Sequence, residues 1–122
     1  MAQKIAWSAS LIKQFEKAGF TSVIVNELTT LGEVWLFDSL YIVIRSEGDE
    51  LVWMATLGTG IKDHVDSILA IAKRAGAKTM RFHVADDEKA ITRFWRKYQP
   101  VEIVGEGFDS GAYRVNLEAL NE

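Results

Sequence analysis

The sequence predicts an α/β domain with a mixed, mostly antiparallel sheet that has one central parallel pair of strands and is flanked by helices. Two observations lead to this prediction. Apolar runs separated by turn residues over residues 33–57 are typical of an antiparallel meander. A helical pattern then separates two strand-like runs, residues 51–57 and 79–84, and a strand, helix, strand connection of this kind joins parallel neighbours.

The segment before the meander contains one clear helical pattern. We expect a helix over residues 9–18, capped by Ser8 or Ser10 and ended by Gly19. Its apolar residues at helical spacing are Trp7, Leu11, Ile12, Phe15 and Ala18. Residues 21–31 mix β-branched and polar side chains, so helix and strand both stay open for this segment.

The meander itself is expected to have three strands, at residues 34–37, 40–44 and 51–57. Turn residues separate them, namely Asp38-Ser39 and Glu47-Gly48-Asp49. Short runs rich in Val, Ile, Trp and Tyr favour strands over a buried helix.

The second half indicates a helix, a strand, another helix and two closing strands. After Gly58 and Gly60 break the sheet, we expect a helix that ends at Gly76. Its apolar face consists of Val65, Ile68, Leu69, Ala72 and Ala75. Residues 79–84 alternate as a strand with two different faces should, and Asp87 caps a further helix that Pro100 ends. The closing strands are expected at residues 101–104 and 112–117.

Length and composition favour a single domain over residues 1–122. A chain of 13.7 kDa with 48% hydrophobic and 25% charged residues is large enough for one core and small for two. The absence of cysteine excludes disulfides, thiolate metal sites and cysteine nucleophiles, and it fits a reducing compartment. Because no window of about 18 apolar residues occurs, we expect no membrane span and a cytoplasmic location.

The formal charge of −3 makes nucleic acid an unlikely partner, because nonspecific affinity for it comes mainly from cations that neutralise phosphates. One local cluster of basic and aromatic side chains stands out, namely Arg93, Trp95, Arg96 and Lys97. This cluster is a candidate contact for a protein partner, and a solvated helix face with a half-buried tryptophan is the alternative explanation.

The order of these elements resembles the plan of the Gcn5-related N-acetyltransferases over residues 33–117. Three short sequence motifs strengthen the resemblance. Residues 71–77 look like the family's helix end, Ala-Lys-x-x-Gly, and residues 57–61 resemble its Gly-x-Gly pyrophosphate loop. Residues 87–94 look like its Asn-x-x-Ala-x-x-x-Tyr helix, with Asp87 in place of Asn and Phe94 in place of Tyr.

The resemblance implies that the chain binds acetyl-coenzyme A. A glycine turn followed by a helix N-terminus offers unpaired N–H groups to the pyrophosphate of the coenzyme. The strand before the turn would hold the pantetheine arm if it splays away from its parallel neighbour. The implied coenzyme-binding residues are Met54, Ala55, Thr56, Gly58, Thr59, Gly60, Ile61, Lys62 and Asp87.

Three departures keep a plain strand-to-helix turn open as the alternative. Asp63 and Asp66 are spaced like a capping pair and compete with an anion for the same N–H groups. Ala55 stands where the family's loop begins with Gln or Arg. Counting back from residues 72–73, the glycines also fall about one residue out of step.

Acetyl transfer to an amine needs a base for the amine proton and an acid for the departing thiolate. In the family the acid is a tyrosine at the position of Phe94, which has no proton to donate. Tyr98, one helical turn later, and His83, near the C-terminal end of its strand, are the substitutes. A buried structural tyrosine and a solvated histidine are the alternatives for these two residues.

Two functions therefore remain. The first is an N-acetyltransferase that uses acetyl-coenzyme A, and the second is a catalytically inactive interaction or inhibitor protein on the same scaffold. The compactness of the chain also suits a phage or mobile-element protein. His64 is expected at the surface beside Asp63, and two isolated histidines without cysteine predict no metal site.

Overall fold

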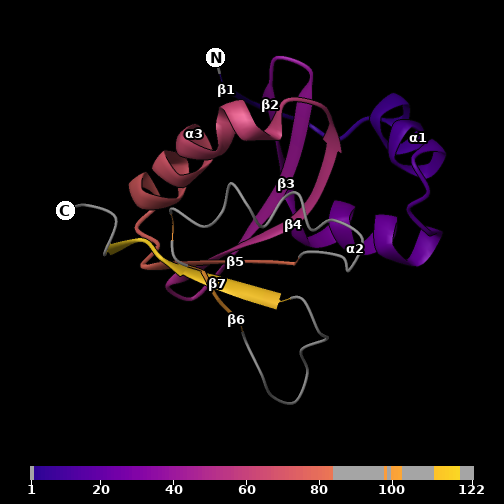
Figure 1. Ribbon diagram of the computed structural model, residues 1–122. Helices are drawn as coiled ribbons and strands as arrows, with labels where there is room; N and C mark the ends of the chain where they lie inside the picture. Colours follow the sequence, from indigo (N-terminus) through magenta and orange to yellow (C-terminus); the bar gives the residue numbers. More distant parts are fainter. Residues whose placement is uncertain (1, 84–97, 99, 103–111, 119–122) are drawn as a thin grey trace. The chain divides into compact units, whose positions relative to one another are not determined.

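The computed structural model describes residues 2–83, 98, 100–102 and 112–118 (Figure 1). Its elements in chain order are β1 (Ala2–Ile5), α1 (Ala9–Lys17), α2 (Ser22–Leu31), β2 (Glu33–Phe37), β3 (Leu40–Glu47), β4 (Glu50–Gly58), α3 (Ile61–Arg74), β5 (Thr79–His83), β6 (Val101–Glu102) and β7 (Ala112–Asn116). The predicted helix over 87–98 lies outside the described residues except for its last position.

The described strands form one hydrogen-bonded sheet in the order β1-β2-β3-β4-β5-β7-β6. The pairs β1–β2, β2–β3, β5–β7 and β6–β7 are antiparallel, whereas β4 and β5 are parallel. This arrangement confirms the mixed α/β sheet with a parallel pair that the sequence predicts. None of the described helices is long and apolar enough to span a membrane.

The contacts within the chain divide it into two compact units. The first unit comprises Met1–Arg45 and Met54–His64, and the second comprises Ser46–Trp53 and Val65–Glu122. The single domain that the sequence predicts remains a prediction.

In the first unit, α1 and α2 contribute to a shared apolar core. Ser8 caps α1 by accepting a hydrogen bond from the Leu11 N–H at 3.1 Å, which confirms the predicted start of this helix. Thr21 caps α2 in the same way, so the segment left open by the sequence is a helix. The buried residues of this core are Leu11, Phe15, Val25, Leu28, Val34, Val43 and Ala55.

β1 is the element that the sequence pattern did not predict. Residues 2–5 pair antiparallel with β2, from Ala2 opposite Phe37 to Ile5 opposite Val34. Gln3 and Lys4 are exposed, and the Lys4 ammonium lies 2.9 Å from the Glu33 carboxylate. The strand depends on this pairing with β2 rather than on an apolar pattern of its own.

In the second unit, α3 buries Val65, Ile68, Leu69 and Ala72 of the predicted face, whereas Ala75, which lies after the end of the helix, is exposed. α3 ends at Arg74, and Gly76 two residues later has a φ of +88°, which belongs to the left-handed region. The N–H of Ala77 donates to the Ala72 carbonyl at 3.1 Å, so the last turn of the helix is closed by backbone bonds. Leu51, Met80 and Val115 lie opposite one another on β4, β5 and β7, and all are buried.

Candidate functional site

β4 and β5 are parallel neighbours. Their pairing joins Glu50 with Thr79, Leu51 with Met80 and Val52 with Arg81. β4 continues to Gly58 and β5 to His83.

A glycine turn follows β4. Gly58 has a φ of +110° and Gly60 a φ of +93°, a region that residues with a Cβ adopt only at a cost. A Cβ on Gly58 would lie 2.2 Å from the carbonyl oxygen of Ser39. Glycine is therefore required at position 58 both by its backbone conformation and by the close approach of the turn between β2 and β3.

α3 begins directly after this turn. The Asp63 N–H donates to the Gly60 carbonyl at 3.0 Å, whereas the N–H groups of Gly60 and Ile61 donate to no described residue. The Asp63 carboxylate is exposed and accepts no hydrogen bond from the described part of the chain. The first turn of the helix thus presents donors that an anion can use.

His64 and Asp38 form a pair beside the glycine turn. The Nε2 atom of His64 lies 3.4 Å from Oδ2 of Asp38, and the imidazole ring lies 5.5 Å from the ring centroid of Phe37. The His64 side chain is only 17% exposed, so the expectation that it lies at the surface is wrong. Asp38 has a φ of +56°, a left-handed value that aspartate tolerates in turns.

Tyr98 and Asp66 are joined in the second unit. Tyr98 is 7% exposed, and its hydroxyl donates a hydrogen bond to Oδ1 of Asp66. His83 ends β5 opposite Ala112, while its side chain lies outside the described part of the structure. The two residues predicted for proton transfer therefore both belong to the second unit.

The other residues that the resemblance implies for coenzyme binding differ in their exposure. Ala55 is buried on β4, whereas Met54 and Thr56 are half-buried. Thr59 is exposed in the turn, and the side chain of Lys62 and the whole of Asp87 lie outside the described part.

A charged cluster marks the end of β4 where the parallel ladder begins. Glu50 accepts hydrogen bonds from the Thr79 hydroxyl at 2.8 Å, from Nη1 of Arg81 at 2.9 Å and from Nη2 of Arg114 at 3.0 Å. Burial of Glu50 raises its pKa, but the hydrogen bonds from Arg114 and Thr79 and the charges of both arginines outweigh burial, so the pKa is lowered. No local sequence pattern indicates this cluster, because its members are far apart in the chain.

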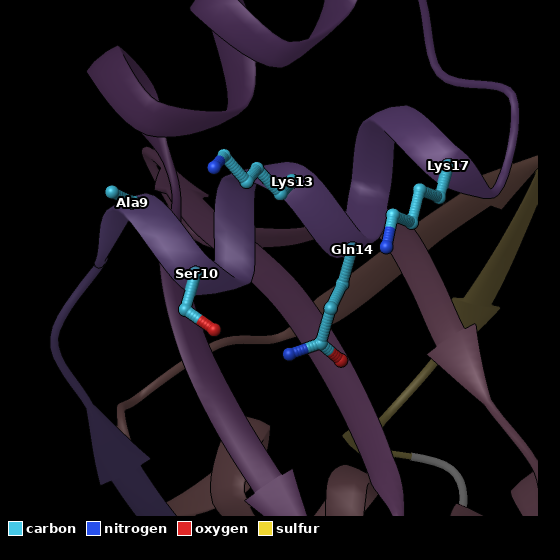
Figure 2. A pocket seen from close by; sticks show the side chains of 5 residues that line it. All are labelled: Ala9, Ser10, Lys13, Gln14 and Lys17. Atoms are coloured by element: carbon cyan, nitrogen blue, oxygen red, sulfur yellow. The ribbon is translucent and has the colours of Figure 1, made fainter.

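Two other features do not form a site. Within the described residues no group of three or more His, Cys, Asp and Glu side chains could hold a metal ion. A shallow hollow lies along α1 and is lined by Ala9, Ser10, Lys13, Gln14 and Lys17 (Figure 2). All these side chains come from one exposed helix face, and none of them is a predicted site residue.

No family model and no curated protein sequence matches the chain. Several solved structures do match it. An IAA acetyltransferase from Bacillus cereus ATCC 14579 has a TM-score of 0.69 at 10% identity, covering 94% of this chain and 96% of that one. An acetyltransferase from Bacillus subtilis in complex with CoA has a TM-score of 0.65 at 12% identity, with coverage of 93% and 95%.

A GNAT-family acetyltransferase from Staphylococcus aureus Mu50 has a TM-score of 0.63 at 13% identity, covering 96% of this chain and 99% of that one. At identities this low, the likeness concerns the fold. Because nearly the whole of each chain is covered, the likeness extends over the fold as a whole rather than over one motif.

Proposed function

We propose that this chain, which has the fold of the Gcn5-related N-acetyltransferases, binds acetyl-coenzyme A and transfers its acetyl group to an amine. The observation that carries the proposal is the glycine turn before α3, where Gly58 and Gly60 have positive φ and the N–H groups of Gly60 and Ile61 donate to no described residue. Unpaired N–H groups at the start of a helix bind phosphate groups. The pyrophosphate of the coenzyme is such a group.

The coenzyme fits the residues that follow this strand. In the proposal, the pantetheine arm lies along β4 at Met54, Ala55 and Thr56. The pyrophosphate is bound at the glycine turn, by the N–H groups of Gly60 and Ile61. The unpaired state of these two groups among the described residues supports this placement. The exposed Asp63 opposes it by its charge, but it does not occupy the donors.

The chemistry requires two proton movements. The amine nitrogen attacks the thioester carbonyl, the carbon–sulfur bond breaks, the amine loses a proton and the thiolate gains one. We assign the acid role to Tyr98, whose hydroxyl donates to Oδ1 of Asp66 in this structure, and the base role to His83 near the end of β5. The acceptor is a small-molecule or protein amine.

An inactive interaction or inhibitor protein is the second candidate. The observation that favours it is the burial of Tyr98 together with its hydrogen bond to Asp66, because a tyrosine held in this way also serves as a packing residue. The protein contact in this reading is the predicted cluster of Arg93, Trp95, Arg96 and Lys97, which lies outside the described residues.

Thermal unfolding with and without acetyl-coenzyme A tests coenzyme binding. A ligand present at about 100 times its dissociation constant adds about 2.7 kcal/mol to the free energy of unfolding. Gly60→Glu should abolish this gain, because it places a carboxylate beside the proposed pyrophosphate. Gly76→Glu is the matched control, since Gly76 has a nearly equal φ of +88° at the other end of α3.

Release of free coenzyme thiol in the presence of candidate amines tests the transfer itself. Binding without thiol release for any primary amine would favour the inactive protein. An absence of any melting shift at millimolar coenzyme would contradict coenzyme binding altogether.

A further inference from the structure

Tyr98 and Asp66 are hydrogen-bonded to each other but differ in exposure. Tyr98 is 7% exposed, whereas Asp66 on α3 is an exposed residue. The Tyr98 hydroxyl donates to Oδ1 of Asp66. Because its partner lies at the surface, the hydroxyl lies at the outer limit of the core while the ring is enclosed. A ligand can therefore approach the oxygen without displacing the ring.

The other tyrosines of the chain are held differently. Tyr41 and Tyr113 are half-buried, and their hydroxyls bond to no described residue. Close packing restricts the torsions that orient a buried ring, so the rotation that remains for Tyr98 is that of the hydroxyl about its bond to the ring. The contact with Asp66 acts on this last degree of freedom.

The position of Asp66 on α3 fits a contact with another element. α3 begins at Ile61, so Asp66 lies in its second turn. The backbone N–H groups that need a cap belong to the first turn of a helix. Asp66 is therefore better placed to accept from a side chain such as Tyr98 than to cap its own helix.

We propose that Asp66 is a positioning residue for acetyl transfer, which holds the hydroxyl of Tyr98 where it can protonate the departing sulfur. This inference rests on the proposed function, in which Tyr98 is the acid. During transfer the O–H bond of Tyr98 breaks as the S–H bond forms, and the tyrosine oxygen then regains a proton from water. The hydroxyl changes its partner by rotation alone, because the enclosed ring keeps its place.

The experiment compares the full chain with Asp66→Asn, Asp66→Ala, Tyr98→Phe and the double variant of Asp66→Ala with Tyr98→Phe. Asparagine keeps an oxygen that accepts a hydrogen bond, and alanine removes it. Ser67→Ala is the matched control, since Ser67 is the exposed neighbour of Asp66 on the same helix. Thiol release from acetyl-coenzyme A with the most reactive primary amine gives kcat and KM, and calorimetry gives the dissociation constant of coenzyme A.

Asp66→Ala should lower kcat by about 10- to 100-fold, because a catalytic group displaced by about 1 Å loses this much of its effect. The KM for the amine and the affinity for coenzyme A should not change, since Asp66 contacts neither. Asp66→Asn should keep kcat within about threefold of the unchanged protein, because its amide oxygen still accepts from Tyr98. In the Tyr98→Phe background, Asp66→Ala should have no further effect on kcat.

A second readout does not depend on turnover. In protein with isotope-labelled tyrosine, NMR resolves the ring carbon that bears the hydroxyl for each of the three tyrosines, and Tyr98→Phe assigns the signal of Tyr98. This signal should move in Asp66→Ala and stay close to its original position in Asp66→Asn and Ser67→Ala.

An unchanged kcat in Asp66→Ala would overturn this inference and leave the proposed function intact. Equal losses in Asp66→Asn and Asp66→Ala, or a Tyr98 signal that does not move in Asp66→Ala, would overturn it as well. If Tyr98→Phe transfers acetyl groups at the original rate, the assignment of the acid fails and this inference fails with it. If the unchanged protein releases no thiol with any amine, the proposed transfer itself fails.

Discussion

Glu50 on β4 accepts two hydrogen bonds from the guanidinium group of Arg114 on β7, one from Nε and one from Nη2 at 3.0 Å. The same carboxylate accepts from Thr79 and Arg81 on β5. Its side chain is 11% exposed. A single carboxylate thus joins three strands at the end of the sheet where the parallel pairing of β4 and β5 begins.

Replacing Glu50 with Gln should lower the free energy of unfolding by about 2 kcal/mol, because hydrogen bonds to a charged group in a covered position are stronger than those to a neutral amide. Chemical denaturation measures this loss. Glu33→Gln is the control. Its pair with Lys4 has exposed fractions of 45% and 59%, so its loss should stay below about 0.5 kcal/mol. Equal losses in both variants would contradict the special role of Glu50.

The contribution of Glu50 should depend on pH in one direction. Hydrogen bonds and nearby charges hold its pKa in the folded protein below the ordinary value of 4.5. A carboxyl with a lowered folded-state pKa stabilises the fold above its unfolded pKa, and this stability is lost as the pH falls through the folded pKa. The difference in unfolding free energy between the unchanged protein and Glu50→Gln should therefore be constant at neutral pH and shrink below 4.5. Denaturation curves across this range test it, and a difference that grows on acidification would refute it.

Gly58→Ala should be more destabilising than Gly19→Ala, although both glycines have nearly the same φ, +110° and +105°. Both variants place a Cβ on a left-handed residue, at about 1–2 kcal/mol each. A Cβ on Gly19 meets nothing within 4 Å, whereas a Cβ on Gly58 meets the Ser39 carbonyl oxygen at 2.2 Å. We expect an additional loss of about 1–3 kcal/mol for Gly58→Ala, measured by denaturation. Similar losses for the two variants would mean that the β2–β3 turn moves aside easily.

The elements that the sequence predicted correctly are those with strong local patterns. α3 repeats apolar residues on one face and ends two residues before Gly76, and the run at residues 79–84 alternates around Met80 and Phe82, which are both buried. β1 has no such pattern. Only its partner β2 makes it a strand, and pairing between distant segments leaves no local signal.

The same distinction between local patterns and distant pairing applies to the residues of the candidate site. Gly58 and Gly60 were predicted as turn residues, and both have the positive φ that such a turn needs. The pairs Asp38–His64 and Glu50–Arg114 were missed, since each joins residues that meet only in the folded chain. The sequence marks where the backbone turns, while the charges that surround the turn come from segments far away in the chain.

Tyr98→Phe separates the catalytic role of Tyr98 from its packing role. It removes the hydroxyl that donates to Asp66 and keeps the buried ring. If Tyr98 is the general acid, acetyl transfer should fall by about 100-fold or more while the affinity for the coenzyme stays the same. Loss of the hydrogen bond alone should cost about 1 kcal/mol of stability.

Tyr113→Phe is the control, because Tyr113 stacks on Phe82 at 5.8 Å and its hydroxyl bonds to no described residue. A Tyr98→Phe protein that is less stable yet transfers acetyl groups at an unchanged rate would assign Tyr98 to the core and leave the acid role to another residue.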